Sequence, residues 1–448
     1  MSDPRSPFPV PAHRSNGATP AASEAPPAET ERADAPWPAF QPGASRQRPQ
    51  QQGPHQQTWP QQETPQQSPS RHGAPQQGSA WGEQPAEASF WGTVATEERT
   101  EDRGEQAREE EEPKPAPRKR EPYLDNVKFL LIALVVVGHS LVPTLNANSS
   151  KALYVFIYTF HMPLFVIISG YLSRNFWNSN AKTNKLVDTF VVPYVIVEVG
   201  YAALRFSLGQ KWSLTIIDPA WLNWYLLALL FWRLSTPVWK RMKQPIPVAI
   251  AIYLFAGFSQ ISGDFSMDRF FGLLPFFVIG LVMQPEHFEM LNRTWVKVVS
   301  AVTLVGAAGV AIYVGLSKLS LKPFYFKHSF QDMDLSWYMG LGLRAGLLLA
   351  SLAMCFAFLA LVPRGETWYT DLGTRTLYCY LLHGIPVLIA KEMGWLDFPW
   401  LHGPLGVLAI STSAFALAIV LCLPETRTVF KWVLEPRLTW LYRRPSGS

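Results

Sequence analysis

Long apolar stretches recur along the chain from Val127 onward, separated by short segments that are polar or rich in glycine and proline. Ten such stretches occur, and most are long enough for a helix to cross a hydrocarbon core of about 30 Å. They cover roughly residues 127–145, 153–173, 190–208, 219–237, 246–262, 269–283, 296–316, 336–361, 374–394 and 404–424. The pattern predicts an all-α polytopic membrane protein with about ten transmembrane helices. The fifth and sixth stretches are short and interrupted, so one of them is also compatible with a re-entrant segment.

The N-terminal part of the chain has the opposite pattern. Residues 1–117 consist mainly of Pro, Gln, Ala, Ser, Gly and Glu, without an apolar repeat at helical or strand spacing. Because such a segment cannot bury enough apolar surface to offset its ordering entropy, we expect a disordered cytoplasmic tail. Its proline-rich motifs and isolated Trp81 and Trp91 leave a cytoplasmic protein partner open. We expect the membrane domain to cover residues 118–425 and a basic cytoplasmic C-terminal tail to cover residues 426–448.

Charge divides the chain at nearly the same place. Up to Glu112 there are 9 Arg, no Lys and 17 acidic residues, which leaves 30 basic and 17 acidic residues for the remainder. This basic excess lies between apolar runs and forms no stripe with interleaved aromatics, which favours contact with membrane lipid and excludes a nucleic-acid binder. If the N-terminus is inside, 18 basic residues fall in cytoplasmic segments and seven in outer ones. The charge distribution therefore predicts a multi-pass cell-membrane protein with both termini cytoplasmic.

The first apolar stretch carries three ionisable residues, Asp125, Lys128 and His139. Eleven residues, about three helical turns, separate Lys128 from His139, so both lie on one helix face, roughly 16 Å apart along the axis. This arrangement suits an anionic donor at the cytoplasmic end and a hydroxyl acceptor, deprotonated by a neutral imidazole, at the other end. A hydrogen bond from His139 to a neighbouring helix is the structural alternative.

Two further stretches contain histidines with polar neighbours. The second carries His161, Ser169 and Arg174, and the ninth carries Tyr380 and His383, three residues apart on one face. His161 can serve the chemistry or simply bond between helices. Arg174, at the cytoplasmic end, can bind donor phosphates or extend toward lipid headgroups.

Glu198 and Arg344 are isolated charges within the third and eighth stretches. Pairing with each other or with the site is the least costly way to keep them at membrane depth. Histidine with lysine, arginine and serine fits acyl transfer, although proton-coupled transport uses the same residue types. Few acidic residues lie inside the stretches and no inverted repeat is evident, which counts against a transporter. The three cysteines lack paired spacing, so neither a disulfide framework nor a zinc site is expected.

Four segments then resemble a known family. DNVKFLLIALVVVGHS, FIYTFHMPLFVIISGYL, NWYLLALLFWRL and LYCYLLHG, in this order, resemble the acyltransferase-3 family of integral membrane acyltransferases, and most closely its fucose 4-O-acetylase-like members. The resemblance covers about residues 120–425. It implies a ten-helix domain that transfers an acyl group, usually acetyl from acetyl-CoA, to a hydroxyl of a carbohydrate or lipid-linked saccharide.

The resemblance also implies roles for individual residues. The family's first-helix histidine corresponds to His139, for which we expect the role of general base on the acceptor hydroxyl; a transient acyl carrier that relays acetyl outward is the alternative. A basic residue, commonly arginine, precedes it by eleven positions, and here Lys128 keeps the charge without the bidentate geometry. Together with the ionisable residues of the apolar stretches, the resemblance gives the complete expected site: the catalytic residues His139, His161 and His383, the donor-binding residues Lys128, Asp125 and Arg174, and the acceptor-binding residues Ser169, Trp224, Tyr225, Tyr380, Glu198 and Arg344.

The sequence thus predicts a membrane-bound O-acyltransferase that moves acetyl from acetyl-CoA to a sugar hydroxyl of a glycan, glycolipid or glycosylated small molecule, with no metal required. A multi-pass transporter or flippase for a saccharide or an acylated product is the alternative. A scaffold that displays the N-terminal tail is a third class, in which the intramembrane histidines would be replaceable.

The predicted orientation can be checked by cysteine labelling. In intact cells, a membrane-impermeant maleimide should label Lys322→Cys, whereas Lys243→Cys should react only after the cells are opened. The unsubstituted chain, with its three native cysteines, provides the background. The reverse labelling pattern would overturn the orientation.

Overall fold

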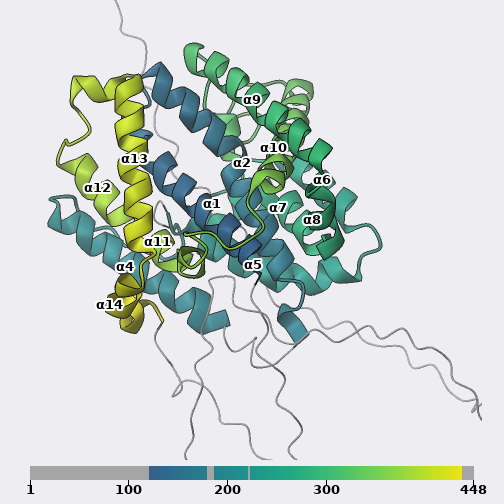
Figure 1. The fold of residues 1–448 in the computed structure, drawn as a ribbon, viewed down its shortest axis with the longest axis horizontal. Coiled ribbons are helices and arrows are strands. Elements are labelled where there is room, and N and C mark those ends of the chain that lie inside the picture. The colour runs from purple at the N-terminus through teal and green to yellow at the C-terminus, as the bar shows by residue number, and fades with distance from the viewer. Residues whose placement is uncertain (1–120, 179–185, 220–221, 436–448) are drawn as a thin grey trace, which may run out of the picture. The chain divides into compact units, whose positions relative to one another are not determined.

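The computed structural model describes residues 121–178, 186–219 and 222–435. All regular secondary structure within these residues is helical, which confirms the predicted all-α class (Figure 1). The expected tail 1–117 and the last residues of the expected C-terminal tail, 436–448, lie outside the described residues. The first residues of that C-terminal tail belong to a short helix, α14 (Pro424–Leu434).

Each of the ten predicted stretches corresponds to helical structure. In chain order the helices are α1 (Pro122–Ser140), α2 (Asn148–Leu172), α4 (Val192–Ser207), α5 (Trp224–Arg241), α6 (Pro245–Phe255), α7 (Met267–Val282), α9 (Thr294–Leu316), α10 (Trp337–Leu361), α11 (Thr376–Leu382) with α12 (Gly384–Glu392), and α13 (Pro404–Leu421). Between α7 and α9 lies the short helix α8 (Pro285–Leu291). Single turns form η1 (Val142–Thr144), η2 (Phe176–Asn178), η3 (Val187–Val191), η4 (Ala256–Phe258), η5 (Asp264–Ser266), η6 (Lys322–Tyr325), η7 (Leu372–Thr374) and η8 (Pro399–His402).

Seven helical segments within the described residues are long and apolar enough to cross a membrane, which makes the chain a multi-pass membrane protein. They contain α1, α2, α4, α7, α9, α10 and α13. The other three predicted stretches differ for local reasons. Helix α5 ends in Lys240 and Arg241, α6 has 11 residues, and the ninth stretch is divided into α11 and α12.

The break between α11 and α12 follows from the sequence Gly384–Ile385–Pro386. Pro386 has no N–H to donate to the carbonyl four residues earlier, and its ring would clash there. A Cβ at Gly384 would lie 2.2 Å from Tyr201 Oη and 2.1 Å from Leu222 Cδ1, so only glycine allows this close approach. The break therefore leaves His383 at the end of a short helix, inside the protein.

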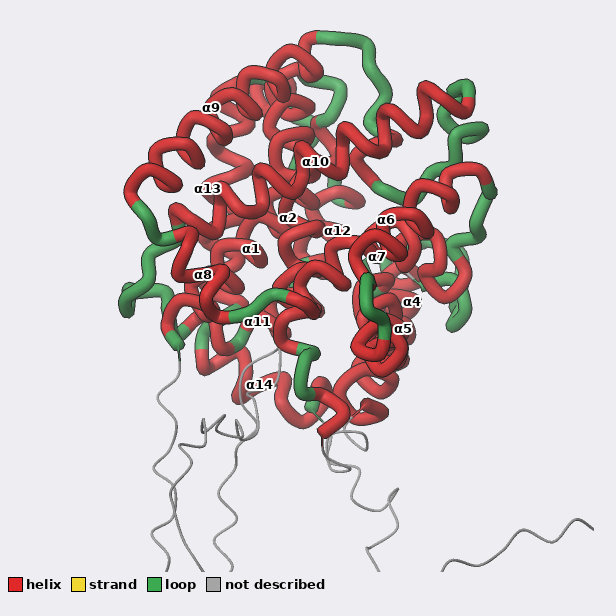
Figure 2. Tube along the Cα trace, turned by 90° about the vertical axis from the view of Figure 1, so that its right-hand side faces the viewer, coloured by secondary structure: helices red, strands yellow, loops and turns green. Residues whose placement is uncertain are grey.

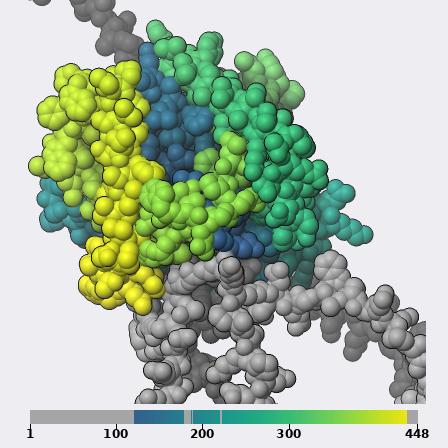
Figure 3. Space-filling view, viewed as in Figure 1, coloured from purple at the N-terminus to yellow at the C-terminus, as the bar shows by residue number. Residues whose placement is uncertain are grey.

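Helices α1 and α2 lie in the middle of the bundle (Figures 1 and 2). Helix α2 packs against α7, α9 and α10, whereas α1 packs against α13, α2 and the turn η7. In the space-filling view, blue atoms of the first helices are visible between yellow α13 and the green helices (Figure 3). Most of α1 and α2 is buried, including Lys128 and His161. Lys128 and His161 are thus surrounded by protein although they lie at membrane depth.

Helices α2 and α7 approach each other closely at two glycines. A Cβ at Gly170 would lie 2.1 Å from the Phe277 carbonyl oxygen, and one at Gly280 would lie 1.9 Å from the Ile167 carbonyl oxygen. The two helices therefore interlock backbone to backbone, which is how small residues join transmembrane helices.

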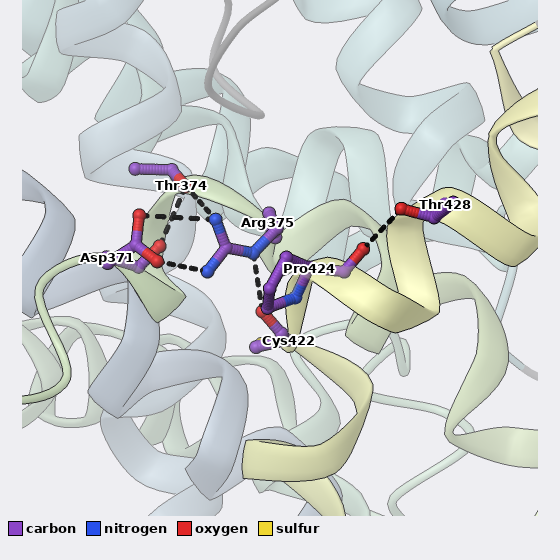
Figure 4. A network of polar contacts seen from close by, with 6 residues as sticks. All are labelled: Asp371, Thr374, Arg375, Cys422, Pro424 and Thr428. Atoms are coloured by element: carbon purple, nitrogen blue, oxygen red, sulfur yellow. Dashed lines mark hydrogen bonds and ion pairs between the residues drawn. The ribbon is translucent and has the colours of Figure 1, made fainter.

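Arg375 fixes the turn η7 to the end of α13 (Figure 4). Its Nε donates to the Cys422 carbonyl oxygen at 2.7 Å, and its guanidinium forms an ion pair with Asp371. On the other side of η7, a Cβ at Gly373 would lie 2.0 Å from the Asp125 carbonyl oxygen. Since α11 follows η7 directly, these contacts set the position of His383 relative to α1.

The α2–α7 contact predicts a selective effect of glycine substitution. Gly170→Ala should lower the free energy of unfolding of the purified protein by about 1–3 kcal/mol, and with it the melting temperature, because the added methyl group must push two backbones apart. Gly306→Ala in α9 is the matched control, since a Cβ there meets nothing within 4 Å. Equal melting temperatures for the two variants in the same detergent would contradict the close packing.

Candidate active site

Two histidines that are 244 residues apart in the chain meet inside the bundle. His139 Nδ1 lies 2.9 Å from His383 Nε2, and the two rings stack with centroids 5.2 Å apart and an interplanar angle of 8°. His383 is fully buried, whereas His139 is partly exposed. The penultimate residue of α1 and the residue after α11 thus form one imidazole pair.

Hydrogen bonding fixes the proton positions in this pair. His383 Nδ1 lies 2.9 Å from the Cys379 carbonyl oxygen, and because a carbonyl only accepts, Nδ1 must carry the proton. In a neutral ring, His383 Nε2 is then the acceptor, so His139 donates its Nδ1–H to it. The proton-accepting lone pair of His139 is consequently on Nε2. This is the tautomer that a general base requires when a second group orients it.

His161 has the same local arrangement. Its Nδ1 donates to the Ile157 carbonyl oxygen at 2.8 Å, four residues earlier, so the lone pair lies on Nε2. His161 is buried, and within the described residues its Nε2 has no hydrogen-bond partner. A neutral His161 in this tautomer accepts a hydrogen bond and cannot donate one to an oxyanion. It fits contact with a donor group of a substrate.

Residues that the sequence analysis did not single out complete this region. The Tyr158 ring lies 4.6 Å from the His161 ring and 6.4 Å from the His139 ring, and it is partly exposed. Tyr325, in η6, lies 5.9 Å from the Tyr158 ring. Arg269, in the first turn of α7, is close enough to His139 to interact with it electrostatically. The spacing of Tyr158 three residues before His161 was a usable sequence signal, whereas nothing in the sequence connected Arg269 or Tyr325 to the site.

The residues expected at the donor end are engaged by the protein itself. Lys128 Nζ forms a buried ion pair with Asp125 at 2.7 Å, so Asp125 holds the Lys128 side chain in place. Arg174 stacks on Tyr171 and donates to the carbonyl oxygens of Tyr171 and Met283 at 3.0 Å each. Arg174 is thus held at the junction between α7 and α8, and part of its hydrogen-bonding capacity is already used.

Ser169, Tyr225 and Tyr380 lie together in the core of the bundle. The Ser169 hydroxyl contacts the Tyr225 hydroxyl, and the Tyr225 ring lies 5.8 Å from the Tyr380 ring. Tyr380 Oη donates to the Leu222 carbonyl oxygen at 2.5 Å, and its ring centroid is 6.5 Å from that of His383. All three residues are buried. Tyr380 connects this group to the histidine pair, and the neighbouring Trp224, whose ring centroid is 5.8 Å from that of Tyr225, is partly exposed.

Glu198 and Arg344 are not paired with each other. Asn223 Nδ2 donates to Glu198 Oε1 at 3.0 Å, while Arg344 donates to the carbonyl oxygens of Tyr253 and His328. Arg344 also stacks on Tyr253. Each charge is therefore stabilised locally by polar groups and rings of its own neighbourhood. Within the described residues, no group of three histidine, cysteine or carboxylate side chains is placed to hold a metal ion.

Comparison with protein families agrees with the four motifs and the helical bundle. The family model described as an acyltransferase domain, that of the acyltransferase-3 family, matches residues 121–423, about two thirds of the chain. The chain belongs to the acyltransferase-3 family. It is therefore a multi-pass membrane acyltransferase, as the sequence predicted. Comparisons with curated proteins and with solved structures found no match.

For this acyltransferase-3 protein, the histidine pair predicts the effect of removing the orienting ring. His383→Phe keeps the ring volume but removes the acceptor of the His139 Nδ1–H, so acyl transfer should fall by about 10²-fold or more. His402→Phe is the matched control, since His402 Nδ1 also contacts a carbonyl four residues earlier but lies outside the site. Full activity of folded His383→Phe would show that the pair does not orient the base.

Proposed function

We propose that the protein transfers an acetyl group from acetyl-CoA to a sugar hydroxyl of a glycan, glycolipid or glycosylated small molecule. Family membership supports acyl transfer, and the resemblance to fucose 4-O-acetylase-like members favours acetyl and carbohydrate. The observation that carries the mechanism is the His139–His383 pair, because it fixes the tautomer of a partly exposed imidazole within a membrane protein.

His139 acts as the general base in this proposal. Its Nε2 takes the proton from the acceptor hydroxyl while the hydroxyl oxygen attacks the thioester carbonyl carbon. The resulting imidazolium keeps its Nδ1–H bond to His383 Nε2, which becomes charge-assisted and therefore stronger. When the tetrahedral intermediate collapses, the carbon–sulfur bond breaks and the CoA thiolate accepts the proton from His139 Nε2. The products are the acetyl ester and free CoA, so atoms and charge balance.

The buried His161 completes the acceptor side of the proposal. Its Nε2 lone pair is available for a hydrogen bond from a second hydroxyl of the sugar, and Tyr158 stands next to the rings of both His161 and His139. A sugar that satisfies this buried nitrogen recovers the free energy that the unpaired atom costs. His161 would thereby position the acceptor without exchanging a proton with it.

The donor is proposed to enter from the end that holds Lys128 and Arg174. That end is the cytoplasmic one in the orientation favoured by the distribution of basic residues. Lys128 and His139 lie on one helix, roughly 16 Å apart along its axis, so an extended thioester can place its phosphates and its acyl carbon at different depths. Arg174 and Lys128 would have to exchange some of their present contacts for donor phosphates.

Radiolabelled acetyl-CoA provides the direct test. Membranes with the wild-type protein should transfer label to a saccharide of a cell-envelope extract, and His139→Ala at matched expression should reduce transfer by about 10²–10⁴-fold. His402→Ala serves as a control for removal of an imidazole outside the site. Retained activity of His139→Ala would exclude His139 as the base. Label that reaches only non-saccharide products would exclude the carbohydrate acceptor.

A further inference from the structure

Arg269 has an unused hydrogen-bonding capacity beside the histidine pair. Its guanidinium offers five N–H donors, yet among the described residues it makes no hydrogen bond. Its contacts are Asp268, with NH1 to Oδ2 at 4.0 Å, and the face of Trp224, with the ring centroid 4.9 Å away. The side chain is 24% exposed, and its charge acts on His139 electrostatically.

Lys327 is a second cation beside the same carboxylate, that of Asp268. Its Nζ lies 3.9 Å from Asp268 Oδ2, beyond hydrogen-bond distance, and its side chain is 31% exposed. No hydrogen bond from Nζ is formed within the described parts of the chain. Burial and the positive charge of Arg269 lower the pKa of the Lys327 amine, although Asp268 opposes this shift. Two like charges are thus held close together on one shared carboxylate.

The nearby carboxylates do not satisfy these cations. Asp268 is 5% exposed, and its Oδ1 accepts from the Arg269 backbone N–H. Asp332 accepts from Ser329 and Gln260, in its own loop and the neighbouring one. Asp218 acts on Arg269 and Lys327 electrostatically, without a described ion-pair contact within 4 Å. The donors of both cations therefore remain available for oxygen atoms from outside the chain.

The surroundings of the two cations fit a sugar. Three partly exposed aromatic side chains lie nearby: Arg269 lies over the Trp224 ring, and the Tyr158 ring lies 6.4 Å from the His139 ring and 5.9 Å from the Tyr325 ring. Binding sites for small molecules typically combine such aromatic side chains with a few polar groups that set the orientation. Here the polar groups are two cations, and cations with unused donors select ligands with negatively charged oxygens.

We infer that Arg269 and Lys327 bind an anionic substituent, a carboxylate or a phosphate, of the acceptor saccharide and thereby place one of its hydroxyls at His139. The inference rests on the proposed function and specifies its acceptor class. Arg269 supplies a planar pair of donors to two oxygens, and Lys327 supplies a point charge to the same group. Removal of either contact should weaken acceptor binding about 10-fold, because a charge-assisted hydrogen bond is lost.

The acceptor charge can be tested without knowing the sugar. Full-length protein in membranes is supplied with radiolabelled acetyl-CoA and cell-envelope extract, and the labelled saccharide is passed over an anion-exchange resin. Label retained by the resin and released by salt is expected. Phosphatase treatment of the saccharide before the column then distinguishes a phosphate monoester from a carboxylate, because only the phosphate monoester is removed and lets the label pass through the resin. Label in the flow-through without phosphatase treatment would overturn the inference while leaving carbohydrate transfer intact.

The two cations are tested by substitution in the same assay. Lys327→Gln and Arg269→Gln should each raise the KM for the extract acceptor about 10-fold, with a smaller change in kcat. Lys318→Gln is the charge-matched control, since Lys318 is exposed on the same inter-helix segment and makes no described ion pair. An unchanged KM in both site variants would overturn the inference. Loss of transfer in all variants and in wild type would instead count against the proposed function.

Discussion

The Cys379 carbonyl oxygen determines where the protons lie in the site. It accepts from the His383 backbone N–H at 3.0 Å and from His383 Nδ1 at 2.9 Å. The second bond leaves His383 Nε2 as an acceptor, which in turn makes His139 Nδ1 a donor. A backbone atom of another helix therefore determines, through two hydrogen bonds, that Nε2 is the basic nitrogen of His139. The contacts of η7 with α13 and α1, directly before α11, place His383 within reach of α1.

Burial makes the loss of any hydrogen bond in this chain costly in free energy. An imidazole surrounded by apolar side chains cannot exchange a lost partner for water, so each unmade bond costs the full desolvation of the group. Tyr380 connects Tyr225 and Ser169 to the pair, and the three side chains satisfy one another or the backbone. These three residues, which the sequence predicted to bind the acceptor, can therefore also serve to exclude water and to hold the His383 ring.

Much of the fold followed from the sequence because lipid imposes a simple rule. A segment inside a bilayer must satisfy its own backbone, so the apolar stretches had to be helices, and their positions agree with the structure to within a few residues. The division of the ninth stretch had a sequence signal in Pro386, which cannot continue the hydrogen bonds of a helix. The close approach of Gly384 to Tyr201 of another helix is a tertiary contact that no single-sequence pattern contains.

The candidate site was only partly predictable for the same reason. His139 and His383 were singled out separately, one from its depth in the first stretch and the other from its neighbour Tyr380, but their pairing spans 244 residues. Glu198 and Arg344 were expected to pair with each other or with the site, whereas each is held by nearby polar groups. Arg269 and Lys327 carried no signal, because basic residues between apolar stretches are common, and only the missing hydrogen bonds of their side chains within the described residues distinguish these two.

The close backbone contacts divide the site between two frames, α1 with η7 and α2 with α7. Helix α1 and the turn η7 touch backbone to backbone at Gly373, and this frame carries both rings of the histidine pair. Helices α2 and α7 interlock at Gly170 and Gly280, and this second frame carries His161, Tyr158 and Arg269. At Gly138 the frames meet through the Tyr158 side chain, 3.0 Å from a Cβ built there. A small sliding of one frame past the other would alter the gap between base and acceptor while leaving the proton positions of the base unchanged.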